Sequence, residues 1–156
     1  MNPQVTPPTA TSPPTAETDR AGLVRELAER FGAGDREGAF RLLHPDLRIQ
    51  QPASLPHGGW HVGRSAMDEM GATFGRYWSR TIGPPRILGC QDTVVQVTTQ
   101  TWTSQRTGDS ATVDVVELFS FTDDLVSEIR VFQQDTAALL QTLGAEVLPQ
   151  SHDMEA

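Results

Sequence analysis

The segment "VFQQDTAALLQTLG" places Asp135 between a strand-like run and a short amphipathic helix. Two interpretations of this aspartate are open. Aspartate is a favoured N-cap, and "DTAALL" has it at the position where a helix would begin. The same carboxylate could instead face a cavity and transfer protons, because removal from water favours the protonated form of a carboxyl group. One oxygen could also cap the helix while the other faces the cavity.

Alternation along the preceding run indicates which residues share a face with Asp135. In "LVSEIRVFQQD", Gln133 and Asp135 have the parity of the apolar residues, whereas Glu128 and Arg130 have the opposite parity and mark the wet face. The apolar residues of that parity are Leu125, Ile129 and Val131. Gln133 and Asp135 are therefore expected on the apolar face, unless a β-bulge reverses the parity.

Glu117 is a second candidate for proton transfer. In "ATVDVVELFSF" it shares its parity with apolar side chains that include Phe119 and Phe121. It could equally be an edge residue, a residue of a dimer interface, or a buried acid paired with arginine. Gln51 shares the parity of the apolar residues in "LRIQQP", so it could donate hydrogen bonds inward or simply end a strand.

Aromatic residues and one histidine are candidates for the wall or rim of the cavity. They are His57, Trp60, Tyr77, Trp78, Trp102, Phe119 and Phe121. Large aromatics are usually core residues, and only Trp60, in a glycine-rich loop, favours a rim position. His57 and His61 are four residues apart, but the intervening "GGW" disfavours a helix and no third ligand is evident, so no metal site is expected. His57 could still transfer protons at a cavity entrance.

The elements that must position these residues follow from hydrophobic periodicity. Helices are expected over 19–31, 36–43, 65–78 and 135–144, strands over 47–52, 86–91, 93–105, 111–121 and 125–134, and a loop over 53–63. This order predicts an α+β fold, in which N-terminal helices pack on the concave face of a cone-shaped, curved antiparallel sheet. Such a cone can enclose a cavity at its open end.

Composition limits the domain organisation and the partners. Residues 1–18 are rich in Pro and Thr and are expected to be a disordered tail, 19–148 a single domain, and 149–156 a flexible tail. The net charge of −8 disfavours nucleic acid and anionic lipid as partners. No run is apolar enough to span a membrane, and the single cysteine fits a cytoplasmic location. The absence of lysine excludes Schiff-base chemistry.

Four segments carry a resemblance to a known family. They are "LVRELAERFGAGDREGAFRLLHPDLRIQQP", "SLPHGGWHVGRSAM", "VVELFSFTDDLVSEIRVFQQD" and "DTAALLQTLG". They resemble the SnoaL-like polyketide cyclases, within the superfamily of nuclear transport factor two and ketosteroid isomerase. The resemblance implies a homodimer and a cyclase or isomerase without cofactor or metal, which acts on an apolar polyketide-type intermediate in natural-product biosynthesis. It also implies a general acid/base at Asp135, which precedes "LLQTLG".

One departure from the family pattern keeps other mechanisms open. SnoaL-like aldol cyclases also use a strand histidine, and "VDVVELFSF" has none, so Glu117 could substitute or the chemistry could differ. Gln51-Pro52 stands where ketosteroid isomerase carries its basic aspartate, which disfavours steroid isomerisation. The cavity could also fold a substrate for a pericyclic ring closure by shape alone. A non-catalytic small-molecule-binding or dimerisation scaffold is the remaining alternative.

Overall fold

The computed structural model describes residues 16–144 of the chain. The C-terminal tail expected over 149–156 lies outside this range, as does nearly all of the N-terminal tail expected over 1–18. The first helix, α1 (Ala16–Gly32), begins three residues earlier than the sequence suggested. Its first two residues, Ala16 and Glu17, have high helix propensity.

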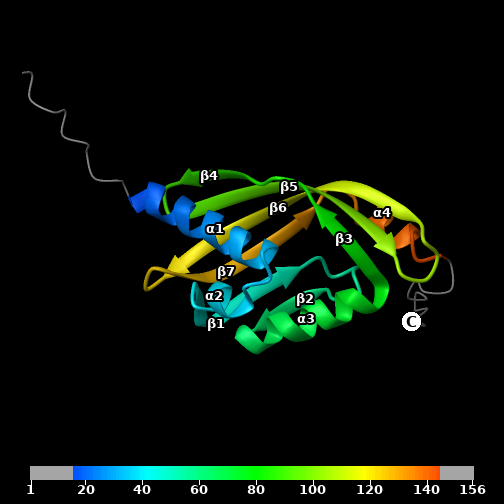
Figure 1. The fold of residues 1–156 in the computed structure, drawn as a ribbon, viewed down its shortest axis with the longest axis horizontal. Coiled ribbons are helices and arrows are strands. Elements are labelled where there is room, and N and C mark those ends of the chain that lie inside the picture. The colour runs from blue at the N-terminus through cyan, green and yellow to red at the C-terminus, as the bar shows by residue number, and fades with distance from the viewer. Residues whose placement is uncertain (1–15, 145–156) are drawn as a thin grey trace, which may run out of the picture.

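The described residues form helices around one curved sheet (Figure 1). The remaining elements are α2 (Arg36–Phe40), β1 (Leu43–Gln51), β2 (Gly59–Val62), α3 (Arg64–Tyr77), β3 (Trp78–Ile82), β4 (Arg86–Cys90), β5 (Thr93–Ser104), β6 (Ser110–Thr122), β7 (Leu125–Gln133) and α4 (Thr136–Gln141). The strand order is β2-β1-β7-β6-β5-β3, and β4 follows β3 along the same edge of β5. All pairs are antiparallel except β1–β7, which is parallel. The expected α+β fold is confirmed.

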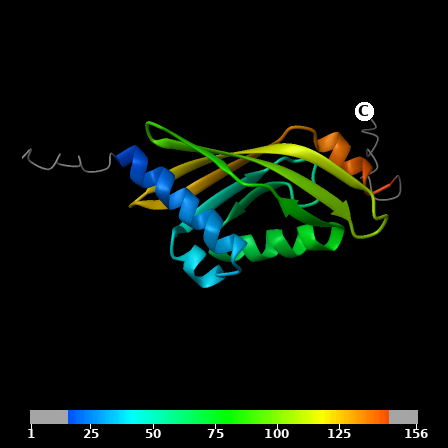
Figure 2. The ribbon, with the colours of Figure 1, turned by 45° about the horizontal axis from the view of Figure 1, so that its top comes forward.

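Helices α1 and α3 lie on the concave side of the sheet, and α4 lies at the end opposite α1 (Figures 1 and 2). Val24 and Leu27 of α1 are buried against β4 and β5, because they occupy one stripe of the helix. Helix α3 contacts β1, β2 and β3. It also joins the two edge strands of the sheet in sequence, with only Gly63 between β2 and its first residue.

Two strands were not expected from the sequence. The segment expected as a loop contains β2 in its last residues, and the residues after α3 form β3 rather than a simple break. Both are short edge strands with exposed residues, so neither has the buried alternation that predicts a strand. The helix expected over 36–43 ends at Phe40, and β1 begins at Leu43 and continues through Pro45. Its pairing with β7 is irregular there, which is where proline is tolerated in a sheet.

A β-bulge reverses the expected parity at the start of β7. The register shifts between Ser120 and Phe121 of β6, so Phe121 lies opposite Val126 while Ser120 lies opposite Glu128. As a result Val126 is fully buried, and Leu125 is only half-buried although its parity placed it inward. Beyond the bulge the expected alternation holds, with Ile129 and Val131 in the core.

Candidate functional site

The middle of the concave face carries polar side chains rather than apolar ones. On β5 the inward residues Gln96, Thr98 and Gln100 are at most 8% exposed. Glu117 of β6 lies directly opposite Gln96 and shares its face, since directly paired residues point to the same side of a sheet. Gln133 of β7 is half-buried in the next row, opposite Val115. This group of inward polar side chains, which we call the polar row, also includes Gln51 of β1.

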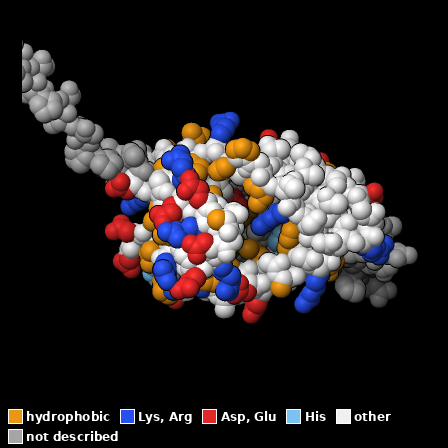
Figure 3. Space-filling model, viewed as in Figure 1, with side chains coloured by type: hydrophobic (Ala, Val, Ile, Leu, Met, Phe, Trp, Pro, Cys, Tyr) orange, Lys and Arg blue, Asp and Glu red, His pale blue; other side chains and the backbone are white. Residues whose placement is uncertain are grey.

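The polar row lies beneath an opening in the helical layer. Arg80 and Ile82 of β3 pair with the inward residues Trp102 and Gln100, yet Arg80 is exposed and Ile82 is 52% exposed. This part of the concave face is therefore open at the β3 edge, although Phe74 of α3 packs against both Trp102 and Arg80. Figure 3 shows this side of the molecule hollowed between the helices, with a basic side chain and a histidine visible in the hollow.

Glu117 is the carboxyl group of the polar row. Gln96 donates from Nε2 to Glu117 Oε2 at 3.0 Å. Burial raises the pKa of Glu117 above its ordinary value, although the positive charge of Arg80 and the Gln96 hydrogen bond both oppose that shift. The expected inward orientation of Glu117 is confirmed, and burial is the main cause of its raised pKa.

Three buried polar atoms of the hollow have no hydrogen-bond partner within residues 16–144. They are Gln96 Oε1, Gln133 Oε1 and His57 Nδ1. Gln133 reaches Gln51 through a long contact of 3.5 Å, and Gln51 donates to the sulfur of Met70 at 3.4 Å. Unsatisfied buried polar atoms are rare because each one costs free energy. Here the atoms of Gln96 and Gln133 lie on the strands that flank Glu117, so a ligand in the hollow could complete their hydrogen bonds.

His57 is held inside the hollow by a tight turn. Leu55 O accepts a hydrogen bond of 2.8 Å from Gly58 N, and His57 O accepts one of 2.8 Å from His61 Nε2. A Cβ on Gly58 would lie 2.3 Å from Pro52 O, so only glycine fits the turn. His57 is 4% exposed, and burial together with the charges of Arg80 and His61 lowers its pKa to about 4. The imidazole is therefore neutral near pH 7.

An aromatic cluster fills the concave face beside the polar row. Phe74, Trp78 and Trp102 surround His57, with ring centroids 5.5, 6.2 and 5.8 Å from the imidazole. Both indoles are 1% exposed and have partners: Trp78 Nε1 donates to Thr142 Oγ1 and Trp102 Nε1 to Gln100 Oε1. Tyr77 is half-buried against Trp78. The two tryptophans are core residues, and they form the closed wall of the hollow.

Asp135 does not lie in the hollow, and its expected place on the apolar face is wrong. β7 ends at Gln133 and the chain bends at Gln134, so strand alternation does not reach Asp135. The residue is exposed, and its Oδ1 accepts a hydrogen bond of 2.9 Å from Ala138 N at the start of α4. The cap is confirmed, whereas a role of Asp135 in proton transfer stays a prediction.

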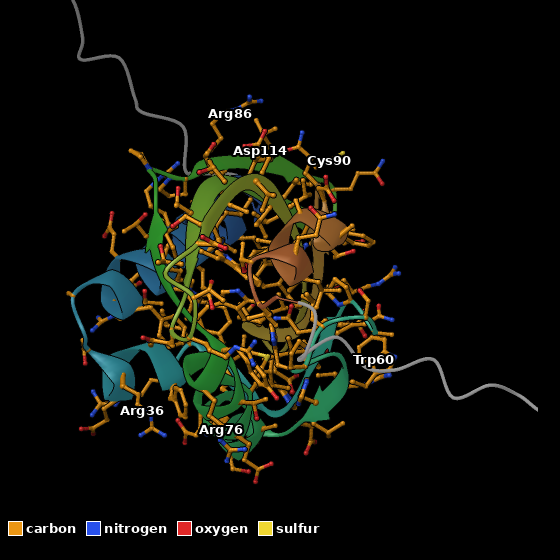
Figure 4. All side chains as sticks on the ribbon, turned by 90° about the vertical axis from the view of Figure 1, so that its right-hand side faces the viewer. Arg36, Trp60, Arg76, Arg86, Cys90 and Asp114 are labelled. Carbon is orange, nitrogen blue, oxygen red and sulfur yellow. The ribbon has the colours of Figure 1, made fainter. Side chains whose placement is uncertain are left out.

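Trp60 is not at the rim of the hollow either. It pairs with Gln50, whose side chain accepts a hydrogen bond from Arg130 on the convex face of the sheet. Trp60 is 44% exposed, its ring packs under the Arg48 guanidinium at 4.3 Å, and Figure 4 shows it pointing away from the interior. The glycine-rich context suggested a rim residue because β2 was not recognised as a strand.

The two phenylalanines of β6 point inward but lie further along the strand, towards α1. Phe119 is 2% exposed, opposite Val94 and Ile129. Phe121 is half-buried, with the Arg20 guanidinium 5.6 Å from its ring centroid. They close the hollow on the α1 side, opposite the aromatic cluster.

Arg80 belongs to the site although no sequence pattern singled it out. Its guanidinium lies 4.9 Å from the ring centroid of Phe74, at the open side of the hollow. Protein around the side chain lowers its pKa, and the charge of Glu117 acts in the opposite direction. The sequence analysis missed Arg80 because it did not predict β3. The segment "WSRTI" has no buried alternation beyond Trp78.

Neither a metal centre nor a membrane span emerges from the described residues. Within 16–144, no three His, Cys, Asp or Glu side chains converge as metal ligands would. None of the helices in that range is both long and apolar enough to cross a bilayer.

The sequence and the fold of this chain are similar to those of known proteins. Residues 24–129 match the family model described as a SnoaL-like domain. A comparison with curated proteins finds no match. The fold is similar to that of TerC co-crystallised with polyporic acid, at 23% identity and a TM-score of 0.73, over 81% of this chain and 99% of TerC.

Two further solved structures have the same fold. An NTF2-like protein from Burkholderia xenovorans is 21% identical with a TM-score of 0.72, over 80% of this chain and 95% of that one. A candidate polyketide cyclase from Silicibacter sp. is 14% identical with a TM-score of 0.67, over 81% and 96% of the two chains. At these identities the likeness concerns the fold alone.

Proposed function

Because the chain belongs to the SnoaL-like domain family, we propose that it is a cofactor-free cyclase or isomerase of natural-product biosynthesis. Its substrate is a largely apolar, carbonyl-bearing compound of polyketide type. Glu117 is the acid/base of the reaction. The observation that carries this proposal is the inward carboxyl of Glu117, hydrogen-bonded to Gln96 among polar atoms that have no protein partner.

The reaction begins with a proton transfer in the hollow. Ionised Glu117 takes a proton from a carbon next to a substrate carbonyl, and the electron pair moves onto the carbonyl oxygen to give an enolate. In an isomerisation, protonated Glu117 returns the proton to a different carbon. In a cyclisation, the enolate carbon attacks a second carbonyl of the same molecule, and the new alkoxide takes the proton from Glu117.

The other residues of the site hold the substrate for this step. The neutral imidazole of His57 and the amides of Gln51 and Gln133 can hydrogen-bond substrate oxygens. The aromatic cluster supplies an apolar wall for the substrate body. Fixing the reacting atoms close together lowers the barrier whichever bond forms, which also supports a purely shape-directed ring closure as a second mechanism.

A homodimer through the convex face of the sheet is part of the proposal. Val116 and Leu118 are half-buried on that face. Phe132, 45% exposed, lies opposite Val116, and Leu88, 51% exposed, lies in the row of Leu118 with Val95 between them. Sedimentation of the wild-type chain is expected to give the mass of a dimer, and Leu118→Glu that of a monomer. A monomeric wild type would contradict this part alone.

The acid/base role is tested by hydrogen–deuterium exchange, which needs no knowledge of the product. The probe is 2-tetralone, an apolar ketone with acidic C–H groups, incubated in D₂O and followed by proton NMR. Glu117→Gln is expected to lower the enzyme-catalysed exchange rate by about 100-fold, the contribution of a well-placed general base. Exchange at the wild-type rate in Glu117→Gln would remove Glu117 from the mechanism.

Asp135→Asn is the matched carboxylate control, because asparagine keeps the helix cap. Its exchange rate is expected to equal that of the wild type. A loss of exchange in Asp135→Asn with full activity in Glu117→Gln would restore Asp135 as the acid/base. A flat pH–rate profile with both variants active would favour the shape-directed mechanism.

A further inference from the structure

Arg80 is a cation placed at the open side of the hollow without a contacting anion. It lies opposite Trp102 in the β3–β5 pairing, on the same face as the polar row. Five of the other arginines in residues 16–144 have carboxylates within 4.0 Å, namely Arg20, Arg30, Arg36, Arg41 and Arg48, so an ion pair is common but not general among them. Arg80 forms no such ion pair within residues 16–144, in a chain whose net charge is −8.

We propose that Arg80 binds a planar oxyanion of the ligand, a carboxylate or a delocalised enolate, and that the hollow therefore selects organic acids with an apolar body. The proposal rests on the hollow being the ligand site of the proposed function. It does not depend on Glu117 transferring a proton.

The geometry of the guanidinium supports this ligand class. Its Cζ lies over the Phe74 ring, 4.9 Å from the centroid, and its N–H donors form no hydrogen bond or ion pair within residues 16–144, so they are available to a ligand. Those donors form a planar fork that matches the two oxygens of a carboxylate, or the oxygens of an enolised dicarbonyl. Charge-assisted hydrogen bonds of this kind are stronger than those between neutral groups.

The neighbouring groups define the rest of the ligand. Gln96 Oε1 and Gln133 Oε1 are acceptors without donors, so they favour hydroxyl groups on the ligand. Phe74 and Trp102, with ring centroids 4.8 Å apart, present an apolar wall to its body. An aromatic or polycyclic acid that carries hydroxyl groups satisfies the cation, the acceptors and the wall together.

Glu117 and the ligand oxyanion compete for the same cation. Ionised Glu117 attracts Arg80 across the hollow, and this attraction ends when Glu117 takes a proton. When Glu117 takes a proton from a bound substrate, Glu117 becomes a neutral acid. The enolate formed in the same step then carries the negative charge that attracts Arg80. Arg80 then stabilises the charge where it develops, as an oxyanion-binding group does.

The test compares an anion with its neutral isostere on the full chain. The probes are 2-naphthoate and methyl 2-naphthoate, titrated by calorimetry. The wild type is expected to bind the anion about tenfold more tightly than the ester, the scale of one charge-assisted hydrogen-bonded contact. Arg80→Gln is expected to abolish this difference while its affinity for the ester stays unchanged, which shows that the hollow is intact.

Arg76→Gln is the matched control, because Arg76 is an exposed arginine of the neighbouring helix that points away from the sheet in Figure 4. It is expected to keep the wild-type preference. Equal affinities of the wild type for the two probes, an unchanged preference in Arg80→Gln, or no detectable binding of the anion at millimolar concentration would overturn the proposal.

The outcome is separate from that of the proposed function. Binding is measured without turnover. If Glu117 proved not to transfer protons, the preference of the wild type for the anion and its loss in Arg80→Gln would still be expected. Glu117→Gln removes the competing charge and is expected to bind 2-naphthoate a few-fold more tightly than the wild type. Weaker binding of the anion to Glu117→Gln would contradict the competition between the two anions.

Discussion

Gln96 donates a hydrogen bond to Glu117 across adjacent strands, at 3.0 Å between Nε2 and Oε2, and the same amide leaves its own oxygen buried without a donor. The contact holds the carboxyl group in place but does not complete the hydrogen bonding of either residue. A pair with only a structural role would be expected to satisfy both side chains. The amide oxygen of Gln96 can therefore accept a further hydrogen bond, as the proposed ligand would supply.

Glu117→Gln is expected to stabilise the fold at about pH 8 and to have little effect at about pH 3. Burial raises the pKa of Glu117 in the folded chain above its value in the unfolded chain. Ionisation therefore removes stability as the pH rises through the raised pKa, and glutamine cannot ionise. A gain of about 1 kcal/mol in the free energy of unfolding, measured in urea, is expected. The exposed Glu69→Gln serves as control, and equal gains in both variants would argue against this origin.

Replacement of His57 is expected to make the free energy of unfolding less dependent on pH below about 6.5. Burial lowers the pKa of His57 from 6.5 to about 4. The unfolded chain therefore binds a proton at a pH where the folded chain does not, so stability is present above about 6.5 and falls between 6.5 and 4. The loss amounts to about 3 kcal/mol at most. His57→Gln should lack this slope while His44→Gln keeps it, as measured by urea unfolding at several pH values.

Substitutions of Asp135 should separate its capping role from any chemistry. Its Oδ1 accepts the hydrogen bond from Ala138 N that caps α4. Asp135→Ala is expected to lower the free energy of unfolding by about 1 kcal/mol, while Asp135→Asn stays close to the wild type. Chemical denaturation of the two variants checks this. Equal stability of the alanine variant and the wild type would mean that the cap contributes nothing.

The turn between β6 and β7 offers a stabilising substitution far from the site. Asp123 and Asp124 both have positive φ, 52° and 58°, as the two central residues of a type I′ turn do. Asp124→Gly is expected to raise the stability by about 0.5 to 1 kcal/mol, because glycine adopts this conformation without strain. Asp124→Ala is the opposing control and should destabilise. Thermal unfolding distinguishes the two, and a destabilised glycine variant would disprove the argument.

The sequence was sufficient for the residues that lie within long, regular strands. Glu117, Gln133 and Gln51 point inward as alternation indicated, because β6, the end of β7 and β1 keep their period beyond the bulge. Alternation failed where the strand ended, so Asp135 was wrongly expected on the apolar face. The sequence of this segment fits both a strand that continues to Asp135 and a helix that Asp135 caps. In the structure the chain bends at Gln134, so Asp135 caps the helix.

Arg80 could not be found in the same way. Its strand follows α3 without a turn residue, and it remains exposed because it borders an opening. An exposed arginine in a sequence has no distinguishing pattern. Only the pairing of β3 with β5 reveals that this one faces the hollow.

Helix α3 spans between the two free edges of the sheet, since it begins next to β2 and leads directly into β3. Its 14 residues correspond to a length of about 21 Å, which fixes how far apart those edges can stand. Inserting one helical turn would separate them by about 5 Å and widen the entrance without altering a single wall residue. The size of molecule admitted could thus change in evolution through the length of one helix, independently of the groups that carry out the chemistry.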